Sequence, residues 1–254
     1  MGDFGITDSL QSYGRPYIIG TSSGSWNKPE EIKPKRTKVI PSLPSDKGKV
    51  SVSNDDLLRT LLNVNPGVFI GDSHTDFNCS EFMTSKMAFL KQQGVTLFFM
   101  EMFGSEAQPK LDRYFEKGDN GEELVSYLQK RGWEKRPGMA KKYFEIVRAA
   151  RENGIKIIGI DNNAAGKNRL EKSNPHWVKV ISNYTSNNHT KYVVFGGQGH
   201  SSNYLFNKGV DFRLGIPSID LETGTPQILL GDGRDSDFSI ILEESPNQTS
   251  FSNI

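Results

Sequence analysis

Acidic residues and histidines stand directly after four apolar segments of the sequence, and these residue types can do acid–base chemistry. They are Asp72, His74, Glu101, Asp161 and His200. A carboxylate beside an imidazole can activate a water molecule or hold a metal ion. The chain has only four histidines, and two of them occupy these positions. The pattern therefore indicates one site for hydrolytic or metal-assisted chemistry.

Asp72 and His74 are two residues apart, which matters if the chain leaves a strand in an extended conformation. Side chains at positions i and i+2 then point the same way, so the carboxylate and the imidazole can act as a pair. The alternative is that Asp72 caps a turn and His74 packs beside it.

Glu101 lies between Met100 and Met102, so we expect its carboxylate to be buried. Burial raises the pKa of a carboxyl group and suits it to proton transfer. The alternative is a structural salt bridge to Arg213 or a nearby lysine, because a buried charge without a partner is costly.

The elements that would position these residues alternate between apolar runs and helical patterns. Apolar runs predict strands at 68–70, 95–100, 155–160, 192–195, 216–221 and 238–242. Helical spacing of apolar residues predicts helices between the first four runs. Such alternation is typical of a parallel sheet covered on both faces. We therefore predict an α/β fold with a mainly parallel sheet, helices on both faces and an active-site rim at the carboxyl ends of the strands.

Composition divides the chain into three parts. Residues 1–50 hold five of the twelve prolines and show no lasting period, so we expect an irregular or flexible N-terminal arm. Residues 51–243 carry the periodic segments and are expected to form a single α/β domain. Residues 244–254 are short and polar, which predicts a flexible C-terminal tail.

Composition also excludes several classes of protein. The net charge of +1 gives no case for nucleic-acid binding. No run of 18 apolar residues occurs, so we expect no transmembrane helix. No signal peptide is visible, and the expected location is cytoplasmic, or a host cell reached through a non-classical secretion system. The basic residues within 28–38 allow peripheral contact with a membrane surface, although a solvated linker is the simpler interpretation.

Cys79 is an alternative nucleophile, with His74 or His200 as its partner. Its position beside Phe82 and Met83 on an expected helix favours a buried and inert thiol instead. The motifs of serine hydrolases with a nucleophile elbow, of zincins and of P-loop enzymes do not occur.

Three motifs occur in a fixed order, and together they resemble the ChaN-like and TIKI-like superfamily. They are Gly71-Asp72-Ser73-His74, Met100-Glu101-Met102-Phe103 and Gly197-Gln198-Gly199-His200. The resemblance covers roughly residues 66–220. This superfamily includes haem-binding ChaN lipoproteins, TIKI metalloproteases, erythromycin esterases, the Ras- and Rap-cleaving effector domain of large bacterial toxins and the related domain of Pasteurella-type toxins.

The resemblance implies a hydrolase, most simply a peptidase or amidase that serves as a bacterial effector or toxin. Asp72, His74, Glu101 and His200 match the family's catalytic positions. His200 or Glu101 would take a proton from water, while His74 and Asp72 would orient the water or polarise the carbonyl. Asp72 stands where the family usually has Glu, which shortens the carboxylate arm.

Ligands and partners follow from the same resemblance. Asp161, Gln198 and Arg213 are expected to contact the substrate, which would be a protein and, more narrowly, a small GTPase. The TIKI branch implies that His74, His200 and Glu101 could hold a divalent metal, whereas the toxin branch implies no metal.

Two alternative functions use the same residues differently. A binding module would hold haem or a protein partner without catalysis, with Tyr114, Tyr143 or Tyr204 as a haem-iron ligand. A metallophosphoesterase is a lesser alternative, suggested by Gly71-Asp72-Ser73-His74. Such enzymes need further histidine motifs, which this sequence lacks.

Overall fold

The computed structural model describes residues 36–166, 168–186, 190–201, 208–231 and 236–244. The chain divides into two compact units, residues 1–31 and residues 32–254. The first unit lies outside the described residues, so the fold below is that of the second unit. The predictions for most of the N-terminal arm and for the C-terminal tail beyond residue 244 also lie outside the described residues.

Nine strands of the described chain form one sheet, in the order β1-β2-β8-β9-β7-β3-β6-β4-β5. They are β1 (Ser45–Asp46), β2 (Lys49–Val50), β3 (Gly67–Asp72), β4 (Val95–Gly104), β5 (Lys156–Asp161), β6 (Lys191–Gly197), β7 (Ser218–Thr223), β8 (Gln227–Leu230) and β9 (Phe238–Leu242). Every pairing among β3, β4, β5, β6, β7 and β9 is parallel, and the pairings of β1, β2 and β8 are antiparallel. The predicted α/β fold with a mainly parallel sheet is confirmed.

Residues 45–50 belong to the sheet, although the sequence places them in the N-terminal arm. Strand β2 pairs with β8, with Val50 opposite Ile228. Val50 is buried against the core, and burial of its side chain favours this pairing. A two-residue strand is too short to show the alternation of apolar and polar residues by which strands are recognised.

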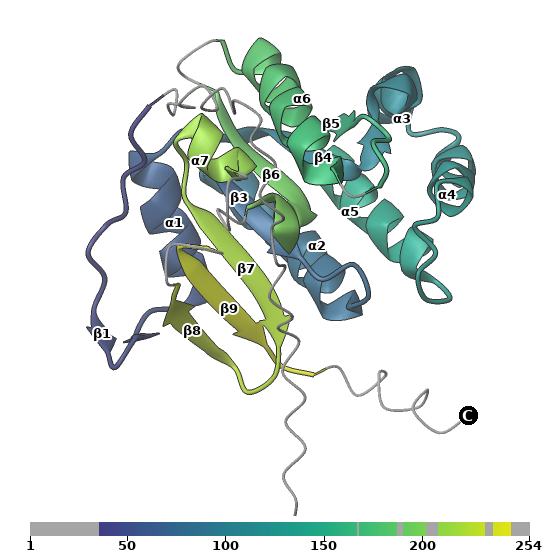
Figure 1. Ribbon diagram of the computed structural model, residues 1–254. Coiled ribbons are helices and arrows are strands. Elements are labelled where there is room, and N and C mark those ends of the chain that lie inside the picture. The colour runs from purple at the N-terminus through teal and green to yellow at the C-terminus, as the bar shows by residue number, and fades with distance from the viewer. Residues whose placement is uncertain (1–35, 167, 187–189, 202–207, 232–235, 245–254) are drawn as a thin grey trace, which may run out of the picture. The chain divides into compact units, whose positions relative to one another are not determined.

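Helices cover both faces of the sheet (Figure 1). They are α1 (Asn54–Val64), α2 (Phe77–Gln92), α3 (Gln108–Lys117), α4 (Gly121–Lys130), α5 (Met139–Glu152), α6 (Arg169–Tyr184) and α7 (Val210–Leu214). Helices α1 to α5 pack into one hydrophobic core, and α6 and α7 pack into a second. Along β3, Val68 and Ile70 face the first core and Phe69 faces the second. Side chains of a strand alternate between faces, which explains why these strands are apolar throughout.

No helix in the described part of the chain is long and apolar enough to cross a membrane. Most of the basic cluster predicted to touch a membrane surface lies outside the described residues. Lys38 is described, and its ammonium donates hydrogen bonds to both carboxylate oxygens of Asp237, at 2.7 and 2.9 Å. This lysine is therefore engaged within the fold.

Candidate active site

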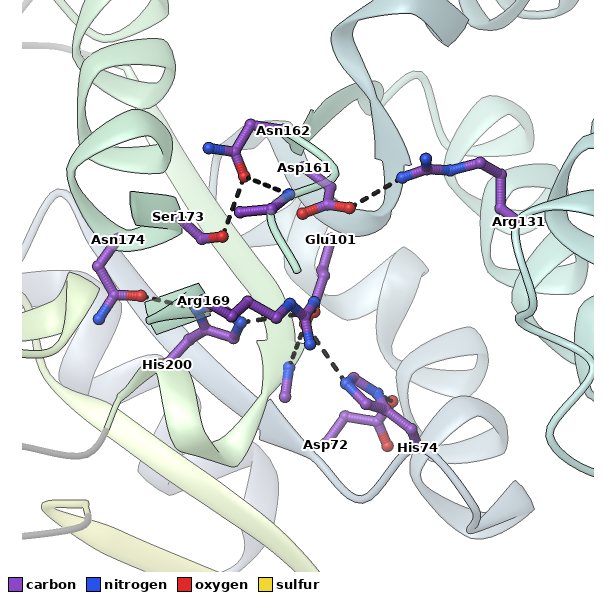
Figure 2. A network of polar contacts seen from close by, with 12 residues as sticks. Asp72, His74, Glu101, Arg131, Asp161, Asn162, Arg169, Ser173, Asn174 and His200 are labelled. Carbon is purple, nitrogen blue, oxygen red and sulfur yellow. Dashed lines mark hydrogen bonds and ion pairs between the residues drawn. The ribbon is translucent and has the colours of Figure 1, made fainter. Parts of the chain in front are cut away.

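The order of the strands brings the predicted catalytic residues together. Strand β6 lies between β3 and β4 in the sheet. Asp72 is the last residue of β3, Glu101 lies in the second half of β4, and His200 follows β6 in a short 3-10 turn. Figure 2 shows the side chains of Asp72, His74 and His200 gathered around Glu101.

Glu101 is at the centre of the site and is fully buried. The pairing of β4 with β5 shifts register between Met100 and Gly104, so Glu101 lies where the regular ladder is interrupted. Such irregularities re-aim side chains near functional sites. The backbone N–H of Gly197 donates to Oε2 of Glu101 at 2.6 Å, and the guanidinium of Arg169 forms an ion pair with Oε1.

The two histidines approach different oxygens of Glu101. Nε2 of His74 lies 3.5 Å from Oε2, and Nε2 of His200 lies 3.5 Å from Oε1. Burial alone would raise the pKa of Glu101, but the two imidazoles outweigh it and hold this pKa well below its usual range. The prediction of a raised pKa for Glu101 is therefore wrong. Glu101 is a carboxylate at neutral pH.

His74 lies between two carboxylates. Its Nδ1 is 3.2 Å from Oδ2 of Asp72, and its Nε2 faces Glu101. The ring of Trp133 meets the His74 ring edge-on, with centroids 4.9 Å apart. Burial disfavours the charged imidazole, but hydrogen bonds to Asp72 and Glu101 outweigh it and raise the pKa of His74 to about 9. His74 therefore carries a positive charge at neutral pH.

Asp72 contacts His74 despite its short side chain. Its Oδ2 also accepts a hydrogen bond of 2.9 Å from the hydroxyl of Tyr143 on helix α5. Asp72 is buried, and the tyrosine holds the carboxylate toward the imidazole. The interpretation of Asp72 and His74 as an interacting pair agrees with this geometry, whereas the cap of helix α2 is Asp76.

Helix α6 fixes the orientation of His200. Oδ1 of Asn174 lies 2.7 Å from Nδ1 of His200, and Nδ2 of Asn174 donates to the carbonyl of Lys208 at 3.3 Å. This amide can only accept from the imidazole, so the proton of a neutral His200 is on Nδ1. The ring of Trp177 stacks on the imidazole, with the two ring centroids 3.9 Å apart. Nε2 is left as the nitrogen that can take up a proton, and it has no hydrogen bond to any described residue.

A cleft of about 510 Å³ opens beside His74. Its lining is His74, Arg131, Gly132, Trp133, Lys135, Asp161, Asn163, Ala164, Ala165, Gly166 and Arg169. Arg169 both lines the cleft and contacts Glu101, so it stands between the cleft and the buried carboxylate (Figure 2). A ligand in this cleft would reach His74 and Arg169 first.

The three residues expected to contact the substrate lie in different places. Asp161 lines the cleft and accepts a hydrogen bond of 2.9 Å from Arg131. Gln198 donates to the carbonyl of Leu221, and Arg213 donates to the carbonyl of Lys208. Neither Gln198 nor Arg213 is among the residues that line the cleft. The structure brings Asp161 to the site and gives the other two a role in holding loops.

Arg169, Asn174 and Arg131 are site residues that the sequence did not identify. Arg169 takes the place beside Glu101 that Arg213 was expected to take. Asn174 and Trp177 are three residues apart on α6, so they share one helix face. A polar residue three positions from a tryptophan on an expected helix is the one sequence signal that could have identified Asn174 as a partner of the histidine after β6.

The residues predicted to bind a metal ion do not form a metal site as they stand. Among the described residues, no group of three or more His, Cys, Asp or Glu side chains is arranged to hold a metal ion. His74 and His200 face different oxygens of Glu101, and the guanidinium of Arg169 already supplies a positive charge at Oε1.

Two of the three tyrosines named as possible haem ligands are described, and neither fits that role. The hydroxyl of Tyr143 is buried and bonded to Asp72. Tyr114 is buried on α3, with its ring against Phe144 and under Arg151. Tyr204 lies outside the described residues.

Cys79 is a free thiol buried in the core. Its sulfur points toward the carbonyl of Leu221 at 3.8 Å. Burial raises the pKa of the thiol, so the reactive thiolate is disfavoured. This arrangement agrees with the expected inert cysteine.

Replacing Gly197 by Ala is expected to disturb His74. A Cβ atom at Gly197 would lie 2.6 Å from Nε2 of His74, closer than real Cβ contacts allow. We expect the imidazole to move away from Glu101 and its pKa to fall toward 6.5, which an NMR titration would measure. Gly199→Ala is the matched control, because its Cβ would lie 3.9 Å from Leu170, an ordinary contact. An unchanged His74 titration in Gly197→Ala would contradict this packing.

The fold and the site can now be compared with known proteins. Residues 61–174 match the protein family described as haem-binding uptake, Tiki superfamily, ChaN. Over this segment the chain is similar to the ChaN/Tiki superfamily. The matched segment contains Asp72, His74, Glu101 and Asp161, together with Arg169 and Asn174.

One curated relative is a toxin. The chain is 28% identical over 184 residues to the multifunctional-autoprocessing repeats-in-toxin of Vibrio vulnificus, in an alignment that covers 65% of this chain. The chain spans only 3% of the length of that toxin.

Two solved structures share the fold. The type III effector HopBA1 matches with a TM-score of 0.62 and 22% identity, over 75% of this chain and 94% of that chain. RRSP, a MARTX toxin effector domain from Vibrio vulnificus, matches with a TM-score of 0.56 and 24% identity, over 79% of this chain and 41% of that chain. At these identities the likeness shows a shared fold and no more.

Proposed function

We propose that this protein is a hydrolase that cleaves a peptide or amide bond with Asp72, His74, Glu101 and His200. The observation that carries the proposal is a charged imidazole that lines a cleft and adjoins a buried carboxylate, which in turn adjoins a second, oriented imidazole. Groups with perturbed pKa values in a cleft favour a catalytic role.

The two histidines have different tasks in this proposal. Nε2 of His200 takes a proton from a water molecule, and Glu101 stabilises the imidazolium that forms. The oxygen of the water bonds to the carbonyl carbon of the substrate. The positive charge of His74 at neutral pH stabilises the developing oxyanion.

The second step releases the products. The tetrahedral intermediate collapses, the bond between carbon and nitrogen breaks, and His200 returns its proton to the leaving amine. Asp72 keeps His74 charged and in place, and Tyr143 holds Asp72. Arg169 lies on Glu101 at the inner end of the cleft, so a bound substrate has to share or displace its guanidinium.

We further infer that the protein is a bacterial effector that acts inside a host cell. The support is its relation to a Vibrio vulnificus toxin and the fold that it shares with a type III effector and a toxin effector domain. A protein substrate, and first of all a small GTPase, is the substrate class that we propose.

The test is incubation of the full chain with a panel of small GTPases, followed by intact-mass spectrometry. We expect one panel member to yield two fragments whose masses add up to the intact protein plus one water. The His74→Ala variant serves as the inactive control. Intact masses for every panel member would remove the support for a GTPase substrate, and full activity of His74→Ala would overturn the proposed site.

A further inference from the structure

The wall of the cleft beside His74 carries more positive than negative charge. Its charged lining residues are His74, Arg131, Lys135, Arg169 and the single acid Asp161. His74 counts among the cations because its pKa is raised to about 9. The imbalance predicts attraction of an anionic group into the cleft.

Two of these cations retain capacity for a ligand. Lys135 is exposed and forms no ion pair with any described residue. Arg131 contacts Asp161 through one nitrogen, Nη2, while its Nη1 forms no hydrogen bond with any described residue. A guanidinium has five N–H donors, so this contact leaves most of them unused.

The balance of charge indicates how much negative charge the ligand carries. Four cations line the cleft, and Asp161 together with the two carboxylates behind His74, Asp72 and Glu101, supplies three negative charges. Glu106 hydrogen-bonds to the lining residue Asn163 and interacts with the charge of Arg131, so it supplies a fourth negative charge. The four cations are therefore balanced, and the cleft suits one singly charged carboxylate better than a phosphate dianion.

We propose that this cleft binds an acidic side chain of the protein substrate, with Lys135 and Arg131 receiving its carboxylate. The inference rests on the proposed function, because the cleft leads to His74 and the substrate would place an Asp or Glu residue near its scissile bond. Arg131 supplies directional hydrogen bonds and Lys135 supplies a point charge.

Binding can be tested separately from catalysis. The probes are short synthetic peptides with one fixed position occupied by Asp, Asn or phosphoserine and the other positions randomised. The peptides are passed over the immobilised full chain carrying His200→Asn, a variant chosen so that no peptide is cleaved. The retained peptides are then quantified by mass spectrometry. We expect about fivefold stronger retention of Asp than of Asn peptides at low salt, as for an exposed ion pair. The preference should disappear at high salt.

Lys135→Glu, added to the same chain, tests whether the cleft is responsible. This charge reversal should abolish the preference for Asp, and it changes an exposed side chain. Lys130→Glu is the matched control, because Lys130 is exposed at the end of α4 and does not line the cleft. It should leave the preference intact.

Three outcomes would overturn the acidic-peptide site: equal retention of Asp and Asn peptides, stronger retention of phosphoserine peptides, or an unchanged preference in Lys135→Glu. A preference for Asp that depends on Lys135 would support the site even if no panel GTPase is cleaved. That combination would count against the proposed hydrolase activity alone, so the two failures can be told apart.

Discussion

Replacing His200 by Asn is expected to lower the rate of peptide hydrolysis by about 10²–10⁴-fold, the usual contribution of a general base. Asn keeps an N–H donor close to the position of Nδ1, so the contact with Asn174 can persist. It removes Nε2, the nitrogen that faces Glu101 and takes the proton of water in the proposed mechanism. The loss should therefore appear in kcat with little change in KM.

The control for this variant is His176→Asn. His176 lies on helix α6 but is not among the residues that line the cleft or contact Glu101. The hydrolysis rate of the His176→Asn variant should stay within a factor of about two of the wild-type rate, as expected for a substitution outside the site. Thermal unfolding of both variants would show whether the fold is retained. A folded His200→Asn variant with undiminished kcat would exclude His200 as the base.

The sequence predicted the parts of the site that depend on strand ends. Apolar runs located β3, β4, β5 and β6, and parallel strands bring their carboxyl ends to one edge of the sheet. Asp72, Glu101 and His200 could therefore be placed near one another without knowing the order of the strands. The three residues lie close together because β3, β6 and β4 are neighbours in the sheet.

The charge state of Glu101 could not be predicted in the same way. Met100 and Met102 show that position 101 is buried, and burial by itself favours the neutral carboxyl group. The partners that reverse this tendency come from other segments. Arg169 is at the start of α6, and His200 follows β6. The neighbouring residues in the sequence reveal that Glu101 is buried. The charged groups that lower its pKa come from distant segments, so only the tertiary fold reveals them.

The residues expected to contact the substrate were also only partly predictable from the local sequence. Asp161 ends strand β5 and lines the cleft, as expected of a residue at a strand end. Gln198 lies in a 3-10 turn and Arg213 in the short helix α7, and both side chains bond to backbone carbonyls instead. Spacing along a strand predicts where a side chain points, but spacing along an irregular turn does not.

The charge on His74 should make the stability of the fold depend on pH. Its pKa is raised from an ordinary 6.5 to about 9 in the folded protein. The folded state therefore binds the proton more tightly than the unfolded state, and the resulting stability is fully present below pH 6.5. It is lost as the pH rises through about 9, and a shift of this size corresponds to about 3 kcal/mol.

The measurement is the free energy of unfolding in denaturant at a series of pH values, for the wild type and for His74→Gln. Because other groups titrate in the same range, the difference between the two proteins isolates the contribution of His74. We expect this difference to shrink by about 3 kcal/mol between pH 6.5 and pH 10.

An NMR titration should place the pKa of His74 near 9, and Asp72→Asn should lower this pKa by removing one of the two carboxylates. A His74 titration near 6.5 in the wild type would show that Asp72 and Glu101 do not charge this imidazole, and the oxyanion role proposed for it would fall with that result.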